Sequence, residues 1–322
     1  MQIPQTPFYK RSAFIYLSIA CAALIFTGIA AMFHNNQPGS KIKNFPDQLV
    51  THDVPPGGNK AVLTLEDGKT ITLNEVPNGK LADQSGVEVT KTGHGELTFH
   101  KEADIPVQTG VMNTIATPNG GTYQLTLPDG SRVWLNAASK LSFPTSFYGM
   151  KERRVTLSGE AYFEIVSDGA RAFKVMTNRG EVHVNEAHFN INGYLDETWA
   201  KVTLFKGSAK VGLTTSQPVT LVPGQQAIVN QGTIQLLNID LADVLAWKNG
   251  IFVFKEAPLE SIMKEISRWY DVDVVYMNID KNKLYTATAP CAENVSTVLK
   301  QLELSGGVHF QIEEGRILAT GL

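Results

Sequence analysis

The chain has 322 residues, of which 43% are hydrophobic and 18% are charged, and this balance excludes an intrinsically disordered protein. A chain of this length has enough apolar residues for two or three folded modules. Its formal net charge is −3 and its Lys and Arg residues are scattered, so it lacks the basic stripe that neutralises phosphates, and we expect no direct binding to nucleic acid.

Residues 13–33 read AFIYLSIACAALIFTGIAAMF and carry no charge. At a rise of about 1.5 Å per residue, a helix of this length crosses a hydrocarbon core of about 30 Å. A secretory signal peptide would have a shorter apolar region, roughly 7–15 residues long, and then a cleavage site of small residues. We therefore predict an uncleaved transmembrane helix. Lys10 and Arg11 precede it, which favours a cytoplasmic tail at residues 1–12 and the bulk of the chain outside.

The segment after this span, residues 34–60, contains prolines at positions 38, 46, 55 and 56 and has neither a helical nor a strand period. We predict a linker that holds the next module away from the membrane. As a flexible coil it would span very roughly 30 Å.

Residues 61–245 are dominated by alternating segments separated by glycine-containing turns, such as VTLSGEAYFEI and KVTLFKGSAKVGL. This pattern predicts a mainly β domain, either a sandwich or a solenoid-like stack. Two segments resemble each other, LTLEDGKTITLN at residues 63–74 and YQLTLPDGSRVWLN at residues 123–136. They share flanking leucines and an Asp-Gly pair, so what repeats is a tight hairpin turn, and Asp67 and Asp129 are predicted to be turn residues rather than catalytic acids.

The pattern changes at residues 246–322, where strands and helices alternate in the order βαββαββ. The first helix begins with Pro258 at its first turn and places Leu259, Ile262, Met263, Ile266 and Trp269 on one face. The second begins at Asn294, buries Val295, Val298, Leu299 and Leu302, and ends near Gly306 and Gly307. We predict a small α+β module, of βαββαβ type, with both helices packed on one sheet.

Two acids in GEAYFEI suggest the carboxylate pair of a glycosidase. Glu160 and Glu164 are four residues apart on a strand, which separates them by about 13 Å. That distance exceeds the roughly 5–9.5 Å that glycoside hydrolysis needs, so a solvated strand face is the better interpretation. No nucleophile elbow, P-loop or dinucleotide fingerprint is present, and we predict no catalytic site and no cofactor.

Histidines and cysteines give no metal site either. His183 and His188 are five residues apart on an alternating strand, so their side chains point to opposite faces and cannot share an ion. Cys21 lies in the apolar segment and Cys291 near the C-terminus, so we expect two unpaired thiols rather than a disulfide.

Several longer segments together resemble the FecR family. The resemblance runs from about residue 60 to the C-terminus, and it is carried by TPNGGTYQLTLPDGSRVWLNAASKLSFPTSF, RRVTLSGEAYFEI, FKVMTNRGEVHVNEAHFNI, LVPGQQA and WKNGIFVFKEAPLESIMKEISRWYDVDVVY. It implies an inner-membrane signal-transduction protein of Gram-negative cells with a periplasmic FecR domain. The C-terminal module would then be similar to the secretin and TonB short domain.

The resemblance also implies partners. Family members relay the state of an outer-membrane TonB-dependent transporter to a cytoplasmic ECF sigma factor, for which they act as anti-sigma regulators of transcription. A protein that relays a signal needs surfaces that bind its partners, and it needs no catalytic nucleophile. We therefore take two places in the α+β module as candidates for binding the N-terminal signalling domain of a transporter. They are the strand formed by Ile251, Phe252, Val253 and Phe254, and the end of the first helix at Trp269 and Tyr270. The alternative is that these aromatic residues belong to the core.

The sequence departs from the family in two places. Relatives usually begin with a helical cytoplasmic domain that holds the sigma factor, whereas MQIPQTPFYKRS stands here and cannot bury a core. Either the true start lies upstream, or this copy has lost sigma control. In some relatives the periplasmic part cleaves itself at a Gly-Thr bond, and those positions here are Glu186 and Ala187. Because Ala187 has no hydroxyl for an acyl shift, we expect no cleavage.

The sequence also allows a second function. The chain could be a membrane-anchored periplasmic protein that binds glycans or acts as a scaffold and has lost sigma control. Neighbouring genes for a sigma factor and a transporter with an N-terminal extension would favour the relay, whereas glycan binding by residues 60–322 would favour the alternative.

Overall fold

The computed structural model describes residues 53–84, 86–93, 95–101, 110–169, 171–213, 217–230 and 232–321. All the described residues belong to the second of two units, Val50–Leu322. The predicted membrane span at residues 13–33 lies outside the described residues. Within the described part of the chain, no helix is both long enough and apolar enough to cross a membrane.

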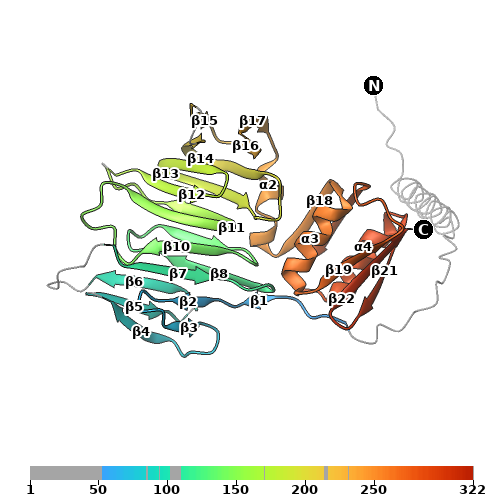
Figure 1. Ribbon diagram of the computed structural model, residues 1–322, viewed down its shortest axis with the longest axis horizontal. Helices are drawn as coiled ribbons and strands as arrows, with labels where there is room; N and C mark the ends of the chain where they lie inside the picture. The colour runs from blue at the N-terminus through green and yellow to red at the C-terminus, as the bar shows by residue number, and fades with distance from the viewer. Residues whose placement is uncertain are drawn as a thin grey trace, which may run out of the picture. The chain divides into compact units, whose positions relative to one another are not determined.

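Most of the second unit is β structure (Figure 1). Seventeen strands, counted among the described residues, form one hydrogen-bonded network that we call the β domain. The strands are β1 (Gly58–Asn59), β2 (Val62–Thr64), β3 (Thr70–Thr72), β4 (Gly79–Gln84), β5 (Val87–Lys91), β6 (Leu97–Lys101), β7 (Met112–Ala116), β8 (Gly121–Thr126), β9 (Arg132–Leu135), β10 (Lys140–Pro144), β11 (Arg153–Ile165), β12 (Phe173–Thr177), β13 (Gly180–Gly193), β14 (Ala200–Gly212), β15 (Val219–Leu221), β16 (Gln225–Asn230) and β17 (Thr233–Asn238). The mainly β prediction is confirmed, and the described strands form no solenoid.

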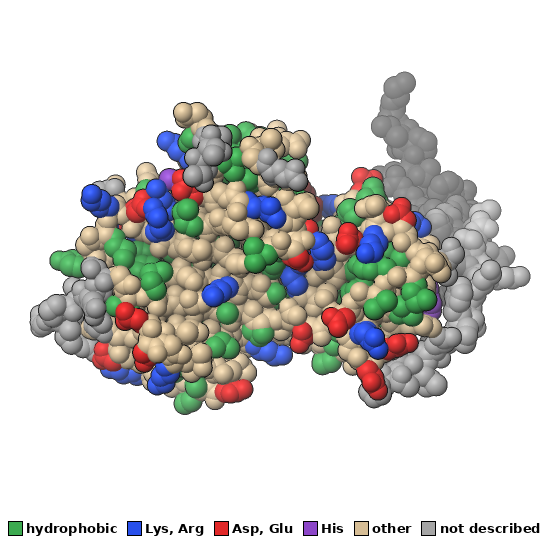
Figure 2. All heavy atoms as spheres, viewed as in Figure 1, with side chains coloured by type: hydrophobic (Ala, Val, Ile, Leu, Met, Phe, Trp, Pro, Cys, Tyr) green, Lys and Arg blue, Asp and Glu red, His purple; other side chains and the backbone are tan. Residues whose placement is uncertain are grey.

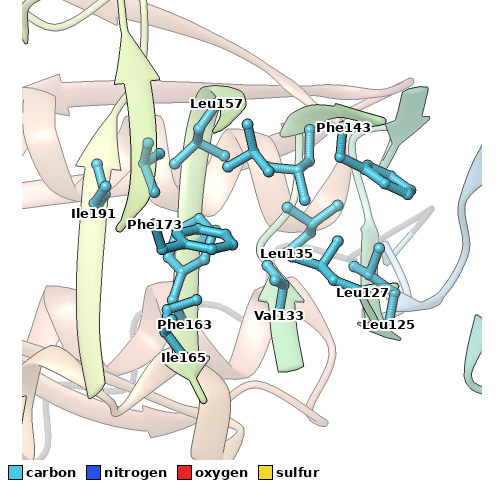
Figure 3. Close-up of a cluster of buried hydrophobic side chains, with 14 of the residues drawn as sticks. Leu125, Leu127, Val133, Leu135, Phe143, Leu157, Phe163, Ile165, Phe173 and Ile191 are labelled. Atoms are coloured by element: carbon cyan, nitrogen blue, oxygen red, sulfur yellow. The ribbon is translucent and has the colours of Figure 1, made fainter. Parts of the chain in front are cut away.

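Three long strands organise this domain. β13 pairs antiparallel with both β11 and β14, and β11 also pairs antiparallel with β9 and in parallel with β12. Alternate residues point inward because successive side chains of a strand face opposite sides. Buried apolar side chains from β8 to β13 therefore meet in one core (Figure 3), which includes Leu125, Val133, Leu135, Phe163, Ile165, Phe173 and Ile191.

The two Asp-Gly segments form the same turn, as predicted. In each, the glycine N–H donates to a leucine carbonyl three residues earlier, at 3.0 Å for Gly68 and 2.9 Å for Gly130. Both glycines have positive φ, +82° and +84°, a conformation that other residues rarely adopt. The Oδ1 atoms of Asp67 and Asp129 accept the N–H two residues later, so both acids stabilise hairpins.

The C-terminal module follows a short connection and has the predicted βαββαββ order. The connection contains α2 (Leu241–Val244) and the 3-10 helix η1 (Trp247–Asn249). The module comprises β18 (Ile251–Pro258), α3 (Leu259–Tyr270), β19 (Asp273–Met277), β20 (Leu284–Pro290), α4 (Val295–Leu304), β21 (Val308–Glu313) and β22 (Arg316–Gly321). The apolar faces of α3 and α4 are buried, including all four α4 residues named from the sequence.

The prediction of a single sheet in this module was wrong. β18 pairs with β20 in one sheet, whereas β19, β22 and β21 form another. The reason lies in the residues between β19 and β20, which hydrogen-bond to the start of α3 instead of closing a hairpin. Leu259 N donates to Lys283 O and Glu260 N donates to Lys281 O, both at 3.0 Å. These bonds satisfy two N–H groups that a helix start leaves free.

The last residues of the predicted linker contact the folded part of the chain. Residues 53–60 pair with both the β domain and the C-terminal module. Gly58 and Asn59 form β1 and run parallel to β8, while Asp53 and Val54 hydrogen-bond to the start of α4. The spacing of the prolines did not reveal this, because Asp53 and Ser296 are 243 positions apart and Gly58 is also distant in sequence from its partner Gly121.

Candidate functional site

The strand β18 carries four of the six residues predicted to bind a partner. Phe252 and Phe254 are buried, with 6% and 3% of their surface exposed, whereas Ile251 is 40% exposed and Val253 is half-buried. The two phenylalanine rings stack at 5.7 Å between centroids. Phe252 and Phe254 therefore support the strand from the core side, and Ile251 and Val253 form its outer face.

One edge of β18 carries no other strand among the described residues, because β18 pairs with β20 alone. Two hydrogen bonds show which backbone groups of β18 point toward β20 and which point away from it. Cys291 N donates to Gly250 O at 2.8 Å on the β20 side, and Ile251 N donates to Ala246 O at 2.9 Å on the opposite side. Backbone groups alternate along an antiparallel pair, so the N–H of Val253 points away from β20. This side is open for pairing with another chain.

The other two predicted residues, at the end of α3, are anchored within the module. Trp269 Nε1 donates to Cys291 O at 2.8 Å, and Tyr270 Oη donates to Glu293 O at 2.7 Å. Burial raises the pKa of the Tyr270 hydroxyl and raises the pKa of the Cys291 thiol to about 12. Both aromatic side chains tie α3 to the segment before α4, so they position the module's elements rather than project from its surface.

The sequence did not predict a cavity of about 330 Å³ that lies between the β domain and α3. Its lining includes Glu160 from β11, Tyr194, Trp247, Glu265 and Arg268. Glu160 is only 7% exposed, so its interpretation as part of a solvated strand face was wrong. Its oxygens accept hydrogen bonds from the side-chain amides of Asn136 and Asn190, both at 2.9 Å.

Two acids in this cavity have raised pKa values. Burial raises the pKa of Glu160, although hydrogen bonds from Asn190 and Asn136 oppose the shift. Burial, followed by the charge of Glu160, raises the pKa of Glu265 to about 7. The Glu265 side chain nevertheless reaches solvent, so water screening weakens any energetic consequence of its shift.

Polar contacts join α3 to the β domain beside this cavity. Lys264 Nζ donates to Asp196 O at 2.8 Å, and Arg268 Nη1 pairs with Asp196 Oδ2 at 3.2 Å. The guanidinium of Arg268 also lies 3.9 Å from the centre of the Tyr194 ring, a favourable cation–π contact. On the face drawn in Figure 2, acidic and basic side chains are interspersed over both the β domain and the C-terminal module, and neither charge forms a separate patch.

Comparisons with known proteins give the family. A model described as FecR protein matches residues 113–210, and one described as FecR, C-terminal, matches residues 251–319. A crystal structure of a proposed anti-sigma factor from Parabacteroides distasonis ATCC 8503 is 30% identical, with a TM-score of 0.61, and the match covers 65% of this chain and 99% of that one. The chain belongs to the FecR family. A second crystal structure of a proposed anti-sigma factor from that organism is 29% identical, with a TM-score of 0.61 and coverage of 66% and 99%. A search of the curated proteins gave no match.

The FecR match places the open edge of β18 and the end of α3 within the FecR C-terminal region. The FecR family is regulatory rather than catalytic. Among the residues that the structure describes, no three His, Cys, Asp or Glu side chains are grouped so that they could hold a metal ion. His183 instead lies 2.8 Å from a carboxylate oxygen of Glu181.

The bond between Glu186 and Ala187, which the resemblance compares with a cleavage site, lies at an irregularity in β13. The register between β13 and β14 shifts between Val184 and Ala187, as in a β-bulge. Ala187 is buried, with 1% of its surface exposed, while Glu186 points to solvent, 4.0 Å from Lys206. The methyl group of Ala187 cannot act as a nucleophile, which is why we expect no self-cleavage. This absence stays a prediction.

Proposed function

We propose that this FecR-family chain is a single-pass inner-membrane anti-sigma regulator that relays the state of a TonB-dependent transporter to an ECF sigma factor. Residues 13–33 would span the membrane, and the chain that follows would lie in the periplasm. The similarity to proposed anti-sigma factors supports a sigma factor as the cytoplasmic partner. The family match over both modules supports a regulatory rather than a catalytic role.

The observation that carries the transporter part of this proposal is the open edge of β18. An exposed strand edge binds extended partners by adding a strand, with backbone hydrogen bonds giving affinity and outward side chains giving specificity. Val253 offers its N–H on this edge, and Ile251 exposes apolar surface beside it. The N-terminal signalling domain of the transporter would pair here.

Photo-crosslinking in cells tests this contact. A photoreactive amino acid at Ile251 should give a crosslink to the transporter when the transporter is expressed. The same amino acid at Thr288, which is exposed on the neighbouring strand β20, is the matched control and should give none. Equal crosslinking from both positions, or none from Ile251, would refute the proposed docking edge.

A further inference from the structure

Residues 53–60, which we call the strap, hold the start of α4. Asn294 is the N-cap of α4 but makes no side-chain cap hydrogen bond. Asp53 supplies the missing cap, because its Oδ1 accepts from Ser296 N at 3.2 Å and its Oδ2 accepts from Ser296 Oγ at 2.6 Å. Val295 N donates to Val54 O at 3.0 Å. Two of the N–H groups that a helix start leaves free are thus satisfied by the strap.

The other end of the strap is bound to the β domain. Gly58 and Asn59 lie in parallel register with Gly121 and Thr122 of β8. Gly58 N donates to Gly120 O at 2.9 Å, and Lys60 N donates to Thr122 O at 3.2 Å. The strap therefore has backbone bonds to both parts of the unit.

The middle of the strap lies against α3. A Cβ atom added to Gly57 would lie 2.8 Å from Gly120 O and 2.9 Å from the Trp269 ring, so only glycine fits without a shift. Gly120 N in turn donates to Arg268 O at 2.7 Å. The end of α3, the strap and the turn before β8 thus form one continuous set of contacts.

From these contacts we propose that the strap couples the C-terminal module to β8 of the β domain, so that a change in the contacts at one end of the strap alters those at the other. Movement of α3 and α4 away from β8 must break the strap's bonds at one end or the other. The strap then keeps its bonds to only one of the two parts and no longer links them. Apart from the strap, α3 contacts the β domain through polar interactions of Lys264 and Arg268 with Asp196, and movement between such parts of a chain is common. This inference goes beyond the proposed function and assumes no particular partner.

Coupling through the strap has a testable consequence. If contacts at one end of the strap are weakened, the hydrogen bonds at its other end must open more often. Ser296→Ala removes the side-chain bond to Asp53 at the α4 end. In the purified full chain it should raise hydrogen exchange of the amides of Gly58 and Lys60 by roughly fivefold, the factor expected when one side-chain hydrogen bond worth about 1 kcal/mol is lost. Ser305→Ala, at the other end of α4, is the matched control. Ser305 Oγ donates to Thr286 O and does not contact the strap, so its variant should leave Gly58 and Lys60 unchanged.

A second pair of variants tests the middle of the strap. Gly57→Ala should raise exchange both at β8 and at the first turn of α4. Gly58→Ala should raise neither, because its Cβ would meet nothing within 4 Å. Unchanged exchange along β11 and β13 would show that the chain still folds. The proposal is overturned if Gly58 and Lys60 keep wild-type exchange in the Ser296→Ala chain, whether or not α4 itself loosens. It is equally overturned if Gly57→Ala affects β8 alone.

Discussion

Arg153 offers the sharpest test of how the β domain is held together. Its side chain is fully buried, and its Nη1 lies 2.8 Å from Asp129 Oδ2, an atom of a side chain that is only 7% exposed. It also donates to Val166 O at 2.8 Å, to Asn185 O at 3.1 Å and to Arg171 O at 3.2 Å. Arg153→Met removes all these donors and leaves a buried carboxylate without its charge partner.

The expected loss is about 3–5 kcal/mol in the free energy of unfolding, the range for breaking a buried ion pair by removing one partner. This is a large share of the roughly 5–15 kcal/mol that stabilises a typical domain. Urea unfolding, followed by tryptophan fluorescence, measures it. Arg154→Met is the matched control: Arg154 pairs with Glu152 and its side chain is 54% exposed, so about 0–1 kcal/mol is expected.

A second substitution separates charge from packing. Asp129→Asn keeps an oxygen that can accept the Ser131 N–H in the turn but removes the unpaired charge. In the Arg153→Met chain it should therefore restore part of the lost stability. The reasoning is refuted if Arg153→Met unfolds at the same urea concentration as Arg154→Met, or if Asp129→Asn makes the Arg153→Met chain still less stable.

Three further outcomes are expected. Burial and Glu160 raise the pKa of Glu265 from 4.5 to about 7, so the folded state binds more protons than the unfolded state between these values, and stability falls as pH rises from about 4.5 to about 7. The melting temperature of the wild type relative to Glu265→Gln should therefore decrease by a small amount between about pH 5 and about pH 7, because the side chain reaches solvent, and then level off; a constant difference would contradict this. The purified chain should run as one band after long incubation, and a new N-terminus at Ala187 would show that cleavage needs no hydroxyl there. A phosphatase fused after residue 60 should be active and one fused after residue 12 inactive; the reverse activities would contradict the proposed topology.

Local features of the fold could be predicted from the sequence because their causes are local. The helices α3 and α4 follow from apolar spacing and from Pro258 and Asn294 at their starts. The two Asp-Gly hairpins follow from the conformations that glycine allows. Each of these features depends on residues within a few positions of one another.

The features that were missed depend on distant parts of the chain. Glu160 looked solvated because strand alternation cannot tell which polar position a second module will cover, and its partners Asn136 and Asn190 lie far away in sequence. Asp53 lies in a proline-rich segment, and its role appears only when α4 is placed beside it. The cavity next to Glu265 exists only because α3 packs beside β11. The one available signal was that Glu160 is followed directly by three apolar residues, Ala161, Tyr162 and Phe163.

The most direct test of the relay is the affinity of the chain for the N-terminal signalling domain of its transporter, measured by calorimetric titration with the purified full chain. Val253→Pro removes an N–H from the open edge of β18 and should leave the β18–β20 ladder intact, since proline is tolerated on edge strands. Thr288→Pro makes the same change on the outer edge of β20 and is the control. The account predicts that Val253→Pro weakens binding at least tenfold, while Thr288→Pro binds as the wild type does. Equal affinity for wild type and Val253→Pro would contradict it.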